Sequence, residues 1–197
     1  MKLRVSGNPY GYRALLVYKK AEALQQACSH YTATFPKHKT LIALADQMDR
    51  SARSVKQNIV EGWKRNSTEE YYDFLGFSIG ANAELEEDCD DLIKGVYKGM
   101  KGGEMGIEQV EKLPFYPLDP RLPLLIQLKL RCKELNFLLT KLQRSLLSKM
   151  REGDGRLKAR WGTGERGKKG DEWLQKALEE QGLIRLDDGQ LVPKKDR

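Results

Sequence analysis

Two histidines and three cysteines are the side chains in this sequence that most often bind metals or act as nucleophiles. His30 lies among polar residues of an expected helix, and His38 lies in the turn after Pro36. Neither has a partner at metal-binding spacing, and a di-iron bundle would need a Glu-x-x-His pair on each of two helices. The chain also lacks a P-loop, a nucleophile elbow and a dinucleotide-binding fingerprint. We therefore predict no catalytic residue, no metal site and no cofactor, and expect a protein that is not an enzyme.

The cysteines lie far apart in the sequence, at Cys28, Cys89 and Cys132. An odd number without Cys-x-x-Cys spacing argues against a disulfide framework and favours a reducing compartment. Each falls on an apolar helical position, where a thiol behaves as a small buried hydrophobic group. Residues 1–7 contain no apolar signal core, and no segment approaches the ~18 apolar residues of a membrane span. The sequence thus predicts a cytoplasmic protein without membrane contact.

The charges are unevenly distributed, with 35 lysines and arginines against 28 acidic residues and a formal net charge of +7. Six acidic residues crowd into one expected helix: Glu84, Glu86, Glu87, Asp88, Asp90 and Asp91. Carboxylates at this spacing spread around the helix, so we expect most of them to face water. The alternative is that they dock a basic surface, such as that of a neighbouring subunit.

The basic residues suggest a partner more directly. They gather on the expected second helix, on the expected fourth helix (Lys129 to Arg151) and in the segment after it, where Trp161 lies among them. Cations with an interleaved aromatic suit a nucleic-acid backbone and a stacked base. We therefore predict RNA or DNA binding, and the alternative is a surface that is merely solubilising. The predicted nucleic-acid-binding residues are Arg50, Arg53, Lys56, Lys64, Arg65, Lys158, Arg160, Trp161, Lys168 and Lys169.

Four segments that carry apolar residues in alternating steps of three and four must position these side chains. The segments run over 17–35, 41–62, 71–96 and 125–146, and the third shows one slip in its spacing, between Leu85 and Cys89. Pro36 ends the first segment. Ser67 and Glu70 form a capping box for the third, and Pro123 suits the first turn of the fourth. The sequence predicts an all-α, antiparallel up-down-up-down four-helix bundle, with a proline-containing loop over 99–121.

The composition changes after Met150. Residues 151–170 are rich in glycine and basic residues, which is typical of a flexible linker. A short helix is expected from Asp171 to Gln181, and an Asp-Gly turn at 187–189 predicts a hairpin of 183–186 with 190–192. We therefore divide the chain into an N-terminal arm (1–11), a bundle (12–150), a linker (151–170) and a small helix-plus-hairpin suffix (171–197). The suffix has too few apolar residues to fold alone, so we expect it to dock on the bundle or on a partner.

The second and third segments carry a recognisable pattern. It runs from Gln47 through Val55, continues over 58–65 as Asn-Ile-Val-Glu-Gly-Trp-Lys-Arg, and extends to Glu84-Leu85; Thr34-Phe35-Pro36 also fits. The pattern resembles that of the four-helix bundle proteins encoded in intervening sequences of bacterial 23S ribosomal RNA genes. That family includes the accessory variability determinant (Avd) of diversity-generating retroelements. The resemblance covers residues from about 12 to 148, and the suffix departs from it.

The resemblance implies a barrel-shaped homopentamer with a positively charged surface and no catalytic residues. In the retroelement branch, it implies binding to a reverse transcriptase and to nucleic acid. Arg50, Arg53, Lys64 and Arg65 match basic positions of the pattern.

Four further motif residues have structural explanations that do not depend on the family. Ser54, Asn58 and Glu61 could form a buried polar network or cap a neighbouring helix, and the small Gly62 allows a close helix approach. The competing hypothesis for the whole chain is a protein-interaction scaffold whose C-terminal element docks a partner.

Overall fold

The computed structural model describes residues 8–100, 105–151, 183–185 and 191–193. The chain divides into two compact units, Met1–Glu152 and Gly153–Arg197. The predicted linker after Arg151 and the predicted 171–181 helix lie outside the described residues.

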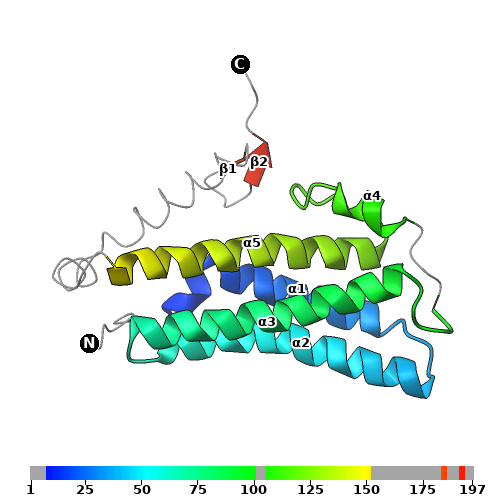
Figure 1. Ribbon diagram of the computed structural model, residues 1–197, viewed down its shortest axis with the longest axis horizontal. Coiled ribbons are helices and arrows are strands. Elements are labelled where there is room, and N and C mark those ends of the chain that lie inside the picture. Colours follow the sequence, from blue (N-terminus) through cyan, green and yellow to red (C-terminus); the bar gives the residue numbers. More distant parts are fainter. Residues whose placement is uncertain (1–7, 101–104, 152–182, 186–190, 194–197) are drawn as a thin grey trace. The chain divides into compact units, whose positions relative to one another are not determined.

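Four long helices make up the first unit: α1 (Leu16–Thr32), α2 (Lys39–Lys64), α3 (Thr68–Ile93) and α5 (Leu124–Arg151). A short 3-10 helix, η1 (Gly11–Ala14), precedes them. The helices lie alongside one another (Figure 1), with α3 against both α2 and α5, and α1 also against both α2 and α5. The predicted all-α four-helix bundle is confirmed.

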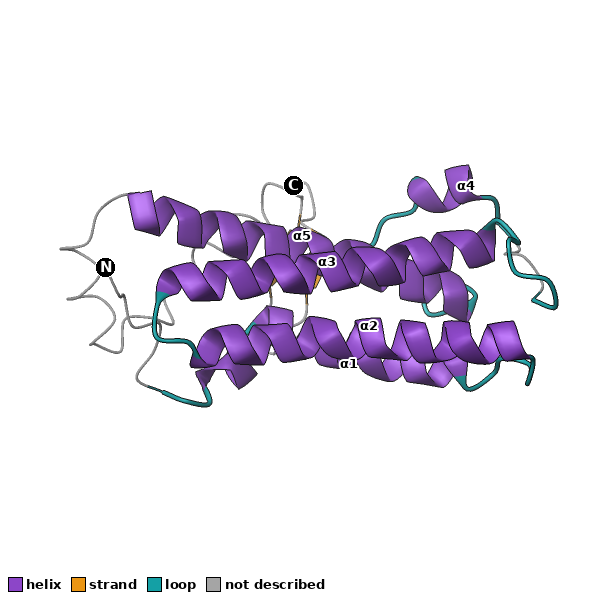
Figure 2. Cartoon of the chain, turned by 60° about the horizontal axis from the view of Figure 1, so that its bottom comes forward, coloured by secondary structure: helices purple, strands orange, loops and turns teal. Residues whose placement is uncertain are grey.

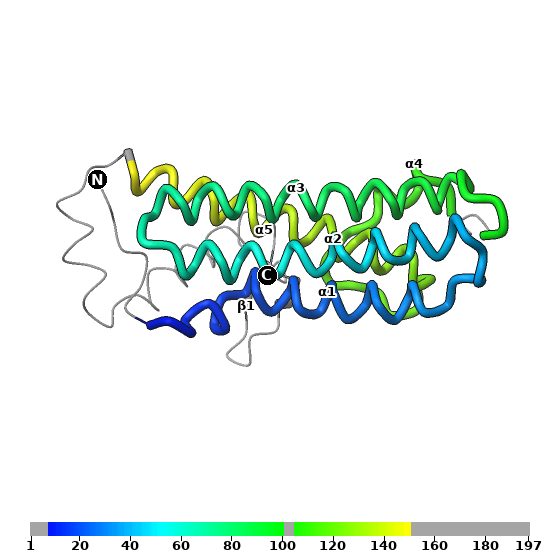
Figure 3. Tube along the Cα trace, turned by 90° about the horizontal axis from the view of Figure 1, so that it is seen from below, coloured from blue at the N-terminus to red at the C-terminus, as the bar shows by residue number. Residues whose placement is uncertain are grey.

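Hydrogen bonds between helices show how the chain runs. Ser51 of α2 donates to Glu84 of α3 (3.2 Å), whereas Ser78, earlier in α3, donates to the carbonyl of Val55, later in α2. Positions rise along one helix as they fall along the other, so α2 and α3 are antiparallel. Figure 3 shows the colours of α1, α2, α3 and α5 progressing in alternating directions along the bundle.

The interior of α3 follows a regular heptad. Tyr71, Leu75, Ser78, Asn82, Leu85, Cys89 and Leu92 alternate by four and three and are all buried. The expected slip was wrong because Asn82, which is polar but 0 % exposed, holds a core position, where its Nδ2 donates to the carbonyl of Cys132 at 2.9 Å. Phe74 is only half-buried, and Val96, which was expected in the core, lies beyond the end of α3 and is 57 % exposed.

The predicted 99–121 loop contains a short helix, α4 (Ile107–Glu111), that sequence spacing did not reveal (Figure 2). Five residues are too few to show a helical period, but Val110 is fully buried and holds the segment down. The predicted start of α3 is confirmed, because the Ser67 hydroxyl accepts from the Glu70 amide at 3.1 Å. The three cysteines are free and buried, as predicted.

The second unit contains two described strands, β1 (Leu183–Arg185) and β2 (Leu191–Pro193). They pair antiparallel, with Ile184 opposite Val192. They lie on either side of the predicted Asp-Gly turn, which is outside the described residues.

Candidate nucleic-acid interface

The outer face of α2 presents two of the predicted cations in its middle. Arg50 and Arg53 are both exposed, and Arg50 Nε lies 2.9 Å from Asp46 Oδ2 one turn earlier. An exposed pair of this kind contributes little to stability. Arg53 has no carboxylate partner among the residues that the structure describes, so its charge is available to a ligand. Lys56 is half-buried at the flank of the helix.

Cations and aromatic rings gather where α2 ends and α3 begins. Lys64 Nζ lies 4.7 Å from the centre of the Tyr10 ring, and Arg13 Cζ lies 5.2 Å from the same centre. Tyr10 itself is 59 % exposed. Arg65 Cζ lies 4.4 Å from the centre of the Phe74 ring. We call Tyr10, Arg13, Lys64, Arg65, Phe74 and the 60 % exposed Phe77 the basic–aromatic end of the bundle.

Close packing beneath this end fixes its geometry. Trp63 Nε1 donates to the carbonyl of Asn8 at 2.9 Å, which ties the N-terminal segment to α2. A Cβ atom on Gly11 would lie 2.5 Å from Cζ2 of Trp63. A Cβ atom on Gly62 would lie 2.7 Å from both Tyr71 Cδ2 and Phe74 Cβ. Glycine at both positions therefore lets the N-terminal segment and α3 approach the end of α2.

The other motif residues do not form the buried network expected of them. Asn58 Nδ2 donates to Ser54 Oγ at 3.2 Å within α2, and both side chains are only half-buried. Glu61 is exposed and pairs with Arg65 instead, at 3.9 Å. The three residues lie on the flank of α2 rather than on its core face, so they neither cap another helix nor meet in one cluster.

One cation of the expected basic surface lies in the interior instead. Lys129 of α5 is 2 % exposed, and its Nζ lies 2.5 Å from Asp90 Oδ1, 3.0 Å from Glu111 Oε1 and 3.3 Å from Glu86 Oε1. Burial lowers the pKa of the Lys129 ammonium, but the bonds to Asp90 and Glu111 raise it by more, so the group stays charged. We call Lys129, Glu86, Asp90 and Glu111 the buried ion cluster, and it joins α3, α4 and α5.

The acidic run of α3 is consequently less solvated than we expected. Glu86 and Asp90 belong to the buried ion cluster, and Glu84 accepts from Ser51 of α2. Asp88 is half-buried, and its Oδ2 is buried without a hydrogen-bond partner. Burial raises the pKa of Asp88 to about 6, with further contributions from Asp91 and Glu84. The expectation failed because neighbouring helices cover one side of the run.

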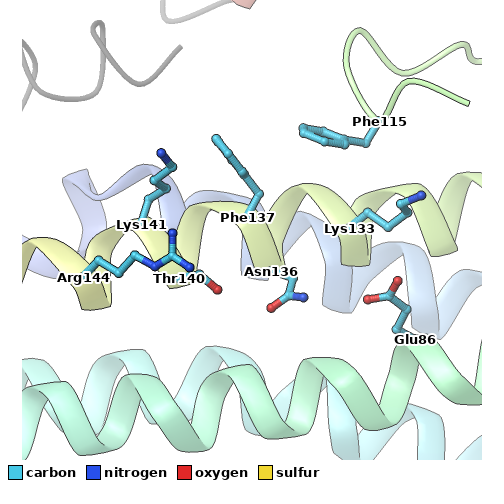
Figure 4. A pocket seen from close by; sticks show the side chains of 8 residues that line it. All are labelled: Glu86, Phe115, Lys133, Asn136, Phe137, Thr140, Lys141 and Arg144. Atoms are coloured by element: carbon cyan, nitrogen blue, oxygen red, sulfur yellow. The ribbon is translucent and has the colours of Figure 1, made fainter. Parts of the chain in front are cut away.

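A groove of about 360 Å³ runs along α5 (Figure 4). Two rows of side chains on α5, each stepping by one helical turn, line it together with Phe115 and Glu86. The rings of Phe115 and Phe137 lie 5.8 Å apart, and Lys141 Nζ lies 5.6 Å from the centre of Phe137. The α5 residues of the groove are Lys133, Asn136, Phe137, Thr140, Lys141 and Arg144.

The α2 motif, with Gly62 against α3 and Trp63 against the N-terminal segment, lies within the part of the chain that matches a known family. Residues 13–98 match the family model described as 23S rRNA-intervening sequence protein. This match confirms the predicted resemblance over α1, α2 and α3. No curated protein and no solved structure matches the chain.

The 23S rRNA-intervening sequence protein match contains all the predicted α2 cations, whereas α5, with most of the groove residues, lies beyond it. Lys158, Arg160, Trp161, Lys168 and Lys169 lie outside the described residues. Arg13, Tyr10 and the α5 groove were not among the predicted sites. The sequence does carry one indication of the groove, which is that residues 135–151 contain cations and no acidic residue.

Within residues 8–100, 105–151 and the two strands, no group of three or more His, Cys, Asp or Glu side chains is placed to hold a metal ion. No described helix is both long and apolar enough to cross a membrane.

Proposed function

We propose that this protein binds RNA or DNA, without catalysing a reaction on it, through the exposed cations of α2 and the basic–aromatic end. The main support is the arrangement around Tyr10, where Lys64 and Arg13 share one exposed ring. Cations beside exposed rings can bind phosphate and stack a base at the same place. The match to 23S rRNA-intervening sequence proteins is consistent with an RNA partner.

The proposal includes assembly of several copies, since the family resemblance implies a homopentamer. A ring of identical subunits would repeat each basic surface around the symmetry axis and strengthen its field. The most specific form of the proposal is an accessory factor that binds a reverse transcriptase together with nucleic acid. Light scattering of the full-length chain would measure the subunit number, and co-purification with a reverse transcriptase encoded by a neighbouring gene would test the partner.

The experiment that tests the proposal is fluorescence anisotropy of labelled RNA and DNA, titrated with the full-length chain over a salt series. The decisive variant is the double change Arg53→Ala with Lys64→Ala, which removes two exposed cations from α2. Each lost phosphate contact lowers the slope of log affinity against log salt by about 0.7 to 0.9. We therefore expect the double variant to bind more weakly, with a slope smaller by about 1.5.

Lys94→Ala with Lys98→Ala provides the matched control, because it removes the same charge from exposed residues at the opposite end of α3. An equal loss of affinity in both variants would mean that binding depends only on the net charge of the protein, and this would contradict the proposed surface. Absence of binding at about 50 mM salt, where backbone contacts are strongest, would overturn the proposal. It would leave the protein-interaction scaffold as the better hypothesis.

A further inference from the structure

The positive charge of the α5 groove is concentrated at one end. Lys133 is neutralised because its Nζ lies 2.9 Å from Glu111 Oε2, and Glu86 is occupied by Lys129. Lys141 and Arg144 follow further along α5, and Arg144 has no carboxylate partner among the described residues. Residues 135 to 151 contain no acidic residue, so no carboxylate of this stretch of α5 opposes the two cations.

Helical spacing brings an apolar and a polar surface together beside these cations. Lys133, Phe137 and Lys141 form one row along α5, and Asn136, Thr140 and Arg144 form the neighbouring row. Figure 4 shows Thr140 and Asn136 following the Arg144 guanidinium along the helix, with Phe137 and Phe115 on the outer side. The groove thus offers two cations, two half-buried rings, a hydroxyl and an amide within about 360 Å³.

These groups indicate which class of ligand the groove could bind. The two cations suit a phosphate, the rings suit a planar group, and the amide and hydroxyl can bond polar edges of that group or a sugar. A volume near the lower end of the ~300–1,000 Å³ typical of small-ligand sites suits one monomer rather than a folded partner. The rings are too close to each other to admit a base between them, so a base would lie against their exposed surfaces.

We propose that the α5 groove holds one nucleotide of a single-stranded nucleic acid, with its phosphate at Lys141 and Arg144 and its base against Phe137 and Phe115. This inference rests on the proposed function and deepens it by naming a preferred strand form. A duplex keeps its bases stacked inside, where these rings cannot contact them, whereas a single strand presents them. The α5 residues of the groove and Phe115 lie outside the segment that matches the family, whereas Glu86 lies within it.

The test compares a labelled single strand with a hairpin duplex of matched length, both titrated with the full-length chain at about 50 mM salt. Phe137→Leu keeps apolar volume but removes the ring. We expect it to weaken single-strand binding about tenfold, the size of one lost base–aromatic stack, and to leave duplex binding unchanged. Arg144→Gln, at an exposed position, should lower the single-strand salt slope by about 0.7.

Phe35→Leu is the matched control, because Phe35 is also half-buried beside another ring, that of Tyr31, but lies at the turn between α1 and α2. Circular dichroism establishes that each variant keeps its helices. The inference is overturned if Phe137→Leu binds the single strand as tightly as the parent, or if it weakens single strand and duplex equally. The proposed function survives either result, provided that the Arg53 and Lys64 double variant still loses affinity.

Competition identifies the ligand class independently of the variants. Adenosine monophosphate should displace the single strand at a lower concentration than inorganic phosphate does, and this difference should disappear in Phe137→Leu. Equal displacement by the two competitors would show a plain anion site and overturn the nucleotide proposal. If the parent protein binds neither single strand nor duplex, the proposed function itself fails.

Discussion

Lys129 and Lys64 are both lysines on long helices of one bundle, yet the protein uses them in opposite ways. Lys129 is buried among three carboxylates, and its charge is cancelled inside the fold. Lys64 lies in the open over the ring of Tyr10, in the basic–aromatic end. The first holds α4 and α5 against α3, whereas the second remains available to an outside partner.

The difference shows how a net charge should be interpreted. The formal net charge of +7 counts both lysines equally, but a polyanion can contact only an exposed lysine such as Lys64. The same holds for the acids, because Glu86 and Asp90 lie in the buried ion cluster and do not oppose a ligand at the other end of the bundle. The spatial separation of paired and unpaired charge therefore supports nucleic-acid binding more than the total does.

The largest expected effect comes from breaking the buried ion cluster. Lys129→Ala leaves three carboxylates near one another without their cation, so we expect the free energy of unfolding to fall by about 3–5 kcal/mol. Urea denaturation followed by circular dichroism measures it. Lys133→Ala removes a more open cation that also bonds Glu111, and it should cost under about 1 kcal/mol. Similar losses in the two variants would contradict the distinction between buried and open lysines.

The heptads of α1, α2 and α5 could be predicted from the sequence because their core positions are mostly apolar. Asn82 and Lys129 could not be placed, since a polar residue at a core position is indistinguishable in sequence from one on the surface. Only the fold supplies their partners, the carbonyl of Cys132 for Asn82 and three carboxylates from two other helices for Lys129.

Only part of the candidate interface could be predicted, because only part of it lies on a helix with a regular apolar period. Arg50, Arg53, Lys64 and Arg65 are exposed as expected, because charged residues opposite an apolar heptad face point to water. Tyr10 and Arg13 were not expected to join Lys64, because they precede the periodic segment and reach α2 through the Trp63–Asn8 bond. Contacts between an irregular segment and a distant helix leave no periodic trace in the sequence.

A smaller effect on stability is expected at Asp88, one of the partly buried acidic residues of α3. The pKa of Asp88, raised to about 6, exceeds the 3.8 of a free aspartate, so folding favours its neutral form. Its stabilising contribution is complete below about pH 4 and is lost as the pH rises through 6. Asp88→Asn should therefore raise the free energy of unfolding at pH 7 by about 1 kcal/mol, after allowance for partial solvent exposure, and change it little at pH 4.

Denaturant midpoints measured at the two pH values provide the test. The exposed Asp73 of α3 offers a control, since Asp73→Asn should shift neither midpoint appreciably. If Asp88→Asn destabilises the protein equally at both pH values, the carboxylate has a partner in the fold and its desolvation is not the dominant effect.

A small effect on stability is expected at Lys64, and it sharpens the contrast with Lys129. An exposed cation–ring contact contributes about 0.5–1 kcal/mol, so Lys64→Gln should lower the free energy of unfolding by no more than that. Nucleic-acid affinity should fall nonetheless, because the charge that we propose contacts phosphate is gone, and Lys64→Arg should restore it. Urea denaturation and anisotropy on the same preparations separate the two properties. A Lys64→Gln variant that loses several kcal/mol would place Lys64 with Lys129 among the structural lysines, and the basic–aromatic end would then be a packing feature rather than a binding surface.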